Sequence, residues 1–237
     1  MRVELLAKQM VERRERILAA AREIIGQSGY EALTMRDLAR ASRVTVPTIY
    51  NLIGSKEQVL FAAIEEQTAR FEASLAGGAE LPPAERLRTI VDACVDEYLR
   101  MPRYYRSLLS LLFISDSAGA MKQRVDRALS TPIGETLTAM RASGELAPWI
   151  ELRPLRGRVR AHLQMTSIQW AAGGLSDEGL RASAHYGASL VMSAATTGAT
   201  RALFEGWARA AQPLAVGQIT SPPNATSASR SDVRKPQ

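Results

Sequence analysis

Residues able to carry out catalysis or bind a metal are few in this sequence and widely spaced. The one cysteine, Cys94, and the two histidines, His162 and His185, lack the spacing of a zinc site. No glycine-rich phosphate loop, nucleophile elbow or paired-carboxylate motif is present. Cys94 lies in an amphipathic segment, which favours a buried thiol over a reactive one. We therefore expect no catalytic or metal site and no cofactor.

Polar residues with an informative spacing occur instead at three predicted helix starts. Thr34 is followed three residues later by Asp37, Thr45 directly precedes a segment with Pro47 in its first turn, and Ser55 opens Ser-Lys-Glu-Gln. A side-chain oxygen at such a position accepts a hydrogen bond from a free backbone N–H of the first turn. Proline is tolerated there because its missing N–H breaks no intrahelical bond. The spacing predicts two short helices followed by a longer one.

A helix must precede these two short ones to support them. Apolar residues follow the spacing of a one-sided helix up to Gly29, which is suited to a left-handed C-terminal cap; they are Ile17, Leu18, Ala21, Ile24 and Ile25. Two short helices joined by a tight turn and packed on other helices form a helix-turn-helix unit. The chemistry expected of such a unit is DNA recognition.

The rest of the chain also reads as helices, which makes the expected fold class all-α with about nine helices. After the long helix that starts at Ser55, the predicted helices are 84–100, 104–115, 118–143, 155–172 and 177–211. The expected domains are a helix-turn-helix DNA-binding domain at 1–56, a helical ligand-binding and dimerisation domain at 57–211, and a disordered tail at 212–237.

Net charge points toward an anionic partner. The chain carries a formal charge of +6 and has a sequence pI of about 9.8. Residues 1–60 hold ten Lys and Arg against seven Asp and Glu, whereas residues 61–211 hold seventeen against sixteen. The longest apolar run is too short to span a membrane, so nucleic acid is the expected partner. A single cysteine suits the reducing cytoplasm, which is the expected location.

Residues 34–57 resemble the DNA-binding signature of the TetR family of transcriptional regulators. In that family T-x-x-x-I-A-x-x-A-G-V-S leads into a T-x-Y-x-H-F recognition helix and then an S-K-E helix start. The matching residues are Thr34, Leu38, Ala39, Ser42, Val44, Thr45, Thr48, Tyr50, Ser55, Lys56 and Glu57. Arg43 replaces the turn glycine, and Ile53 replaces the recognition-helix aromatic. Arginine in a left-handed turn costs about 1 kcal/mol of strain, whereas Ile53 keeps its position apolar.

The motif predicts how the protein meets DNA. Residues in the first turn of a recognition helix face base edges in the major groove, where Val46, Pro47 and the Thr48 methyl could meet thymine methyl groups. The family resemblance puts Thr45, Tyr50 and Lys56 on phosphates. The candidate DNA-binding residues are Thr34, Arg36, Arg43, Thr45, Val46, Pro47, Thr48, Tyr50, Asn51 and Lys56.

Assembly and ligand binding follow from the same resemblance. The family pairs its last two helices with those of a second subunit, and a homodimer would place two recognition helices on one palindromic operator. Small residues form a candidate dimer interface: Ala184, Gly187, Ala188, Val191, Ala194, Ala195 and Gly198. An intramolecular packing face is the alternative for this stripe.

A ligand pocket for a small apolar or amphipathic effector is expected among the middle helices. Its candidate residues are Phe71, Tyr98, Phe113, Met165, Gln169 and Trp170. Any one of these side chains could instead fill a solid core. A ligand-responsive repressor is thus the leading hypothesis. The alternative is a helical enzyme or scaffold protein whose helix-turn-helix serves only for packing.

Overall fold

The computed structural model describes residues 2–78, 80–114 and 119–217 of the chain. Its residues form ten α-helices and one short 3-10 helix, which confirms the all-α fold class. The helices are α1 (Arg2–Ser28), α2 (Met35–Ser42), α3 (Val46–Leu52), α4 (Lys56–Ser74), α5 (Pro83–Arg100), α6 (Pro102–Ile114), α7 (Gly119–Ala142), α8 (Leu152–Ala171), α9 (Asp177–Ala195) and α10 (Gly198–Gly217), with the 3-10 helix at Ala76–Gly78.

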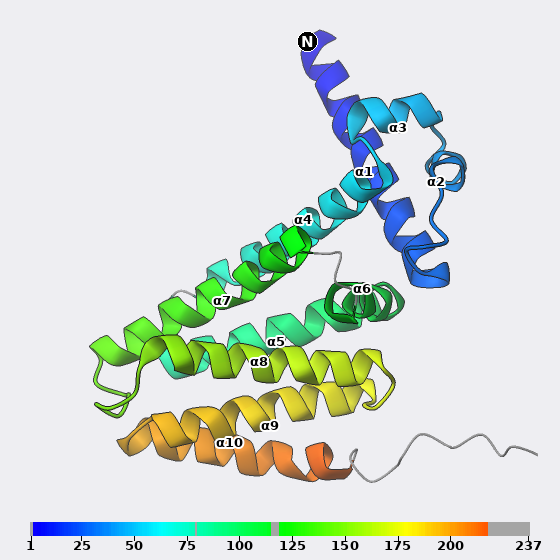
Figure 1. Cartoon of the computed structure of the whole chain (residues 1–237). Coiled ribbons are helices and arrows are strands. Elements are labelled where there is room, and N and C mark those ends of the chain that lie inside the picture. Colours follow the sequence, from blue (N-terminus) through cyan, green and yellow to red (C-terminus); the bar gives the residue numbers. More distant parts are fainter. Residues whose placement is uncertain (1, 79, 115–118, 218–237) are drawn as a thin grey trace, which may run out of the picture.

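The helices α1, α2 and α3 form a small unit at one end of the molecule (Figure 1). Ile17 on α1, Leu38 on α2 and Ile49 on α3 are each fully buried and join the helices in one apolar core. Burying such a side chain contributes roughly 1.5–3 kcal/mol, which offsets the low stability of helices as short as α2 and α3. Gly29 ends α1 at φ +81, as expected for a left-handed cap.

Helix α4 connects this unit with the larger helical part. Figure 1 shows it running from the N-terminal unit down alongside α7. Val59, Leu60 and Ala63 in its first half are buried in the core shared with α1, and Phe71 near its end is buried against α5 and α7. One rigid element therefore reaches both the helix-turn-helix and the middle of the larger part.

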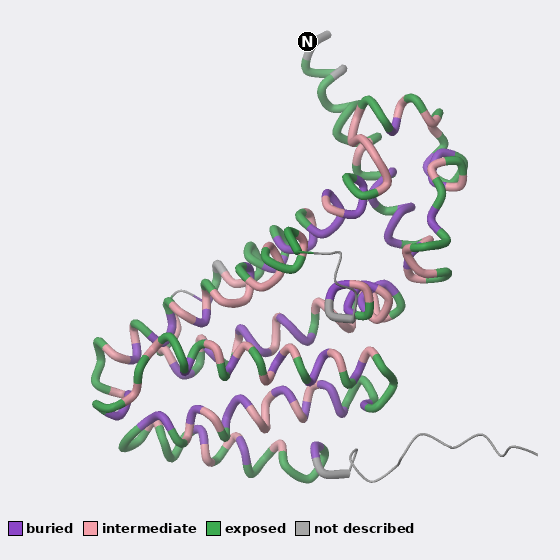
Figure 2. The backbone as a smooth tube through the Cα atoms, in the orientation of Figure 1, coloured by how far each residue is buried: buried purple, intermediate pink, exposed green. Residues whose placement is uncertain are grey.

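The larger part stacks its helices in layers. In Figure 1, α5 and α8 lie above α9, and α9 lies on α10; α6 is seen nearly along its axis next to the lower end of α1. Buried positions face the inside of this stack, while exposed positions lie on its outer surface (Figure 2). Trp170, Met192 and Ile133 are fully buried within it.

The prediction of one helix over residues 177–211 was wrong, and for this reason the described residues form ten helices rather than nine. Thr196 is extended, at φ −104 and ψ 169, and Gly198 has a φ of +55. The break is fastened to the loop before α8, because Ala147 N–H donates to Ala195 O and Thr197 N–H donates to Glu145 O, each at 2.9 Å. Two β-branched residues and a glycine are weak helix formers, so this backbone pairing prevails.

Other boundaries also differ from the sequence-based expectation; helix α8, for example, begins at Leu152, three residues earlier than predicted. Helix α10 continues through Pro213 to Gly217, so residues 212–217 are helical and not part of a disordered tail. The remainder of the predicted tail, 218–237, lies outside the described residues. Helix α6 begins at Pro102, two residues earlier than predicted, because proline suits the first turn. Among the described helices, none is both long and apolar enough to span a bilayer.

Candidate nucleic-acid interface and ligand cavity

All three predicted helix caps are present at the helix-turn-helix. Thr34 Oγ1 accepts from Asp37 N–H at 3.1 Å, and Thr45 Oγ1 accepts from Thr48 N–H at 3.4 Å. Ser55 and Gln58 form a reciprocal capping box, with Ser55 N–H donating to Gln58 Oε1 at 2.8 Å. Such caps fix where each helix starts, and therefore which side chains the first turn of α3 presents.

Arg43 occupies the left-handed turn between α2 and α3. Its φ of 54 and ψ of 47 lie in the left-handed region, which makes it the one non-glycine residue with positive φ in the described part of the chain. Arg43 N–H donates to Arg40 O at 3.3 Å, and Val44 N–H donates to Ala39 O at 3.0 Å, a Schellman-type end of α2. The turn of the family motif is kept although its glycine is not, and the Arg43 side chain is exposed.

The outer surface of α3 is free to meet a ligand. Ile49 anchors the helix in the core, so the side chains on the opposite face point away from the protein. Tyr50 is 53% exposed, Pro47 and Asn51 are exposed, and Val46 is half-buried. An exposed aromatic beside an exposed first turn is suited to contact a phosphate and base edges together.

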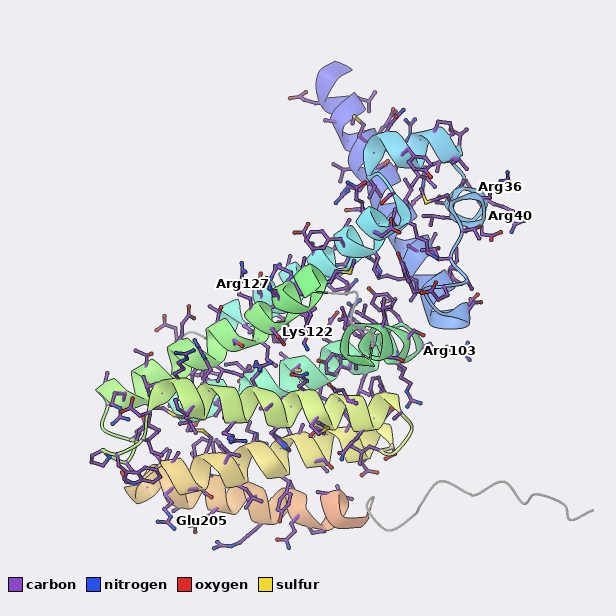
Figure 3. All side chains as sticks on the ribbon, viewed as in Figure 1. Arg36, Arg40, Arg103, Lys122, Arg127 and Glu205 are labelled. Carbon is purple, nitrogen blue, oxygen red and sulfur yellow. The ribbon has the colours of Figure 1, made fainter. Side chains whose placement is uncertain are left out.

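Basic side chains surround this surface. Arg36 and Arg40 project outward from α2 in Figure 3, and both are exposed. Arg40 also pairs with Asp37, a contact open to solvent that leaves its remaining donors available. Arg40 was not among the predicted DNA-binding residues, although its position four residues after Arg36 indicates the same helix face.

Lys56 is held more tightly than the motif suggested. Its Nζ donates to Glu31 O at 3.1 Å and lies 4.4 Å from the centre of the Tyr30 ring. An ammonium has three donors, so Lys56 can bridge the loop after α1 and an anion bound at the start of α4. The predicted DNA-binding residues thus gather on α2, α3 and the first turn of α4, and all ten are exposed or half-buried.

A cavity of about 70 Å³ lies between α4, α5, α6 and α7. Most of its wall is apolar, and the apolar wall residues are Ile64, Phe71, Leu108, Leu109, Leu112, Val125, Ala128 and Leu129. Its remaining wall residues are polar or weakly polar: Gln67, Thr68, Cys94, Glu97, Tyr98 and Tyr105. Two of the predicted pocket residues, Phe71 and Tyr98, line this cavity.

The other predicted pocket residues do not line it. Met165 is 56% exposed and Gln169 is exposed, because the buried face of α8 passes through Leu163 and Trp170 instead. Trp170 is fully buried and stacks on Tyr98, with 6.2 Å between ring centres, so it supports the cavity wall from behind. The assignment of Met165 and Gln169 is therefore corrected. The side chain of the last candidate, Phe113, lies outside the described residues.

Hydrogen bonds order the polar end of the cavity. Arg100 donates to both Glu97 and Gln67, and the Tyr105 hydroxyl donates to Glu97. Burial raises the pKa of Tyr105 and of Tyr98, so both remain neutral phenols. Burial likewise raises the pKa of the Cys94 thiol to about 11, which keeps it protonated and unreactive at neutral pH.

Much of the predicted dimer stripe faces the inside of its own subunit. Ala184, Ala188 and Ala195 are each at most 4% exposed because α9 lies between α8 and α10. A Cβ on Gly187 would come within 2.1 Å of the His162 ring on α8, so this glycine serves a close intramolecular approach. These four residues are corrected to internal packing positions.

The rest of the stripe lies nearer the surface. Ala194 and Gly198 are exposed, and Val191 is half-buried. An exposed stripe that sequence analysis missed continues on α10 at the i, i+4, i+7 and i+11 positions Ala199, Leu203, Gly206 and Ala210.

Both histidines make structural contacts. His162 Nε2 lies 3.0 Å from Ser183 O, and burial lowers the pKa of this histidine, so the neutral ring donates its N–H to the carbonyl. His185 Nε2 lies 2.7 Å from Asp92 Oδ1, a contact between α9 and α5 that Arg181 reinforces. Within the described residues, no group of three or more His, Cys, Asp and Glu side chains could hold a metal ion.

The helix-turn-helix lies within a recognised family segment. Residues 17–63 match the family described as bacterial regulatory proteins, tetR family, and these residues contain α2, α3 and the first part of α4. This segment is therefore a tetR-family DNA-binding domain. The predicted family is thereby confirmed.

Curated relatives of this chain are regulators of transcription and not enzymes. The transcriptional repressor KstR of Mycolicibacterium smegmatis is 32% identical over 122 residues, which cover 49% of this chain and 58% of that protein. The regulator HbdR of an Aromatoleum species is 29% identical over 140 residues, 55% of each chain. The chain thus spans little more than half the length of these two relatives.

Solved structures share the fold with this chain. SmeT, the repressor of the Stenotrophomonas maltophilia multidrug efflux pump SmeDEF, has a TM-score of 0.67 at 19% identity and covers 79% of this chain and 92% of its own. FadR of Bacillus subtilis in complex with stearoyl-CoA has a TM-score of 0.66 at 20% identity, with coverage of 75% and 97%. At this identity the likeness extends to the fold alone.

Proposed function

We propose that this chain is a ligand-responsive transcriptional regulator of the cytoplasm: a repressor that binds a palindromic operator as a homodimer and is released by a small apolar or amphipathic ligand. The observation that carries the proposal is the capped and outward-facing α3. Its first turn is fixed by Thr45, and its exposed surface carries Pro47, Tyr50 and Asn51. A helix presented in this way fits the major groove of DNA.

DNA contacts divide into two kinds. Thr48 and the two residues before it face base edges and supply sequence preference, whereas Tyr50, Lys56 and the arginines of α2 bind phosphates. Phosphate contacts give most of the affinity and make it dependent on salt. The basic excess within residues 1–60 supports phosphate contacts by this part of the chain.

Homodimerisation is supported by the exposed α10 stripe of Ala199, Leu203, Gly206 and Ala210. Leu203 is 39% exposed, and Leu190 on the neighbouring α9 is 45% exposed. Small residues let a helix of the second subunit approach closely, and a two-fold axis there would give the operator its palindromic form.

The effector site is the cavity between α4, α5, α6 and α7. Its volume of about 70 Å³ is far below the roughly 300 Å³ or more of a typical ligand pocket, so a ligand must push the surrounding helices apart. Helix α4 lines the cavity with Gln67 and Phe71 and carries α3 at its other end. A tilt of α4 moves the recognition helix, and a tenfold loss of operator affinity requires a coupling free energy of about 1.4 kcal/mol. The stearoyl-CoA bound by FadR of Bacillus subtilis supports an effector with an apolar part.

Titration of a selected operator with variants tests the DNA assignment. Tyr50→Ala and Lys56→Ala should each weaken binding by about 1 kcal/mol, and Lys56→Ala should lower the salt slope by about one unit. Thr48→Ala should relax the preference at one base position. Arg127→Ala is the matched control, because Arg127 projects from α7 in Figure 3, away from α3. If all four variants bound the operator with the affinity of the wild type, α3 would not contact DNA.

Light scattering tests the dimer. Leu203→Glu and Gly206→Glu put charge on the exposed stripe of α10 and should give monomers at micromolar concentration. Ala161→Glu on the exposed face of α8 should leave the dimer intact. If the wild-type protein were a monomer under native conditions, the proposed homodimer would be wrong.

A further inference from the structure

One buried donor at the cavity has no partner. The Gln67 side chain lines the cavity, and the residue is 3% exposed. Its Nε2 is buried and makes no hydrogen bond within the described part of the chain. A buried N–H without an acceptor is unfavourable, and such groups are rare in folded proteins.

The orientation of the Gln67 amide follows from its neighbours. The oxygen accepts from the Arg100 guanidinium, and the Tyr105 hydroxyl is 3.5 Å from the same oxygen. A guanidinium carries only donors, so rotating the amide by half a turn would set its NH₂ against the N–H groups of Arg100. The amide oxygen of Gln67 therefore accepts from Arg100, and its NH₂ is the group available to a ligand in the cavity.

Charge at this end of the cavity is already compensated. Glu97 accepts from Arg100 through both carboxylate oxygens and also from Tyr105. Its bond with Arg100 Nε is 3.1 Å long, and its side chain is 15% exposed. An added carboxylate would lie beside Glu97, and an added ammonium would face the NH₂ of Gln67, so both charges would be desolvated at a cost.

From these contacts we infer that the cavity recognises a ligand with one uncharged hydrogen-bond acceptor, a carbonyl oxygen, on a compact apolar body. The carbonyl accepts from Gln67 Nε2. The apolar body packs against Phe71, Leu112 and Val125, which line the cavity from α4, α6 and α7. This inference rests on the proposed effector site and specifies the ligand class of that site.

Four probes of one size separate the alternatives. The ketone 2-hexanone and its isostere 2-methyl-1-hexene differ only in the acceptor, while hexanoate and hexylammonium carry a charge. Dissociation constants come from ligand-observed NMR titrations of the full chain. The ketone should bind about 5- to 10-fold more tightly than the alkene, as expected for one added hydrogen bond, and more tightly than either ion.

Variants assign the preference to Gln67. Gln67→Leu should remove the advantage of the ketone and leave the affinity for the alkene unchanged. Thr68→Val, the next residue in the same wall, should keep the advantage, because the Thr68 hydroxyl already donates to Glu65 O at 3.0 Å. If Gln67→Leu does not fold, the same titrations of Gln67→Met, together with the comparison of ketone and alkene binding to the wild type, still test the role of Gln67.

Several outcomes would overturn the inference. Equal binding of ketone and alkene to the wild type would do so, as would tighter binding of either ion. A chain that binds an operator but none of the probes would also overturn it while leaving the DNA-binding proposal intact. A chain that prefers the ketone through Gln67 but binds no operator would support the inference and reject the proposed function.

Discussion

Arg22 on α1 and Glu66 on α4 form an ion pair across the junction of the two parts of the chain. Arg22 Nη1 lies 2.9 Å from Glu66 Oε2, and the two side chains are only 8% and 21% exposed. Glu66 precedes Gln67, so the pair lies one residue from the polar end of the cavity. Close by, a Cβ on Gly26 of α1 would come within 3.0 Å of Tyr104 N at the start of α6. Helix α1 is therefore packed directly against two elements that line the cavity.

Loss of this ion pair should destabilise the fold. Arg22→Ala leaves the partly buried Glu66 carboxylate with Arg70 alone, and we expect a loss of about 1–3 kcal/mol in the free energy of unfolding. Arg70→Ala is the matched control; the Arg70 side chain is 51% exposed, so its loss should cost less than about 1 kcal/mol. Urea denaturation measures both variants, and equal losses would mean that Arg22 has no special role.

The contact between Gly187 and His162 predicts a large effect from one methyl group. Gly187→Ala would force the His162 ring to move and should cost about 1–3 kcal/mol of stability. Gly157→Ala on α8 has nothing within 4 Å and should be neutral or stabilising by up to about 1 kcal/mol. Thermal denaturation compares the two variants. The internal placement of Gly187 would be wrong if its variant were as stable as that of Gly157.

Stability should decrease as the pH falls below about 6.5, because His162 is kept neutral by burial. Burial lowers the pKa of His162, so the unfolded chain takes up a proton at a higher pH than the native state does. As the pH falls, the loss of stability therefore begins near the pKa of His162 in the unfolded chain and ends at its lower pKa in the native state.

His162→Gln isolates this contribution in melting temperatures measured from pH 8 to pH 5. The variant should lose less stability over that range than the wild type. Asp92 does not interfere with this comparison. Burial alone would raise the pKa of Asp92, but its hydrogen bond with His185 and the nearby positive charges lower the pKa overall, so the contribution of Asp92 to stability is lost only in more acidic solution. Parallel curves for the two proteins would contradict the assignment to His162.

Glycine at position 43 should separate turn strain from DNA binding. Arg43→Gly relieves the left-handed conformation and should stabilise the protein by about 0.5–1 kcal/mol. If Arg43 binds a phosphate, the same variant should bind the operator more weakly and with a shallower salt dependence. Arg43→Ala is the matched control. It keeps the strained left-handed conformation but removes the charge, so it should lower operator affinity without raising stability.

Local signals were sufficient to predict the helix-turn-helix. The caps at Thr34, Thr45 and Ser55 depend on residues three positions apart, so the sequence alone contains them. The replacement of glycine by Arg43 did not change the turn, because the hydrogen bonds that end α2 enforce the left-handed conformation.

The cavity and the packing faces depend on contacts between distant helices, and the predictions were weaker there. Met165 is a large side chain, but the buried stripe Leu155, Val159, Leu163 and Trp170 excludes it from the inner face of α8. The stripe of small residues on α9 could pack against α8 of the same subunit or against a second subunit. No local sequence pattern distinguishes these two partners. Gln67 was missed because its importance lies in Arg100 and Tyr105, which belong to other helices.

The most direct test of the central claim is selection of duplexes from a random-sequence DNA pool by the full chain, followed by sequencing. A regulator that reads DNA with two α3 helices should enrich an inverted repeat whose half-sites are about one helical turn apart or a multiple of it. Thr48→Ala should broaden the enriched base at one position in each half-site. A pool with no enriched sequence, captured equally by the wild type and by Tyr50→Ala, would contradict the account.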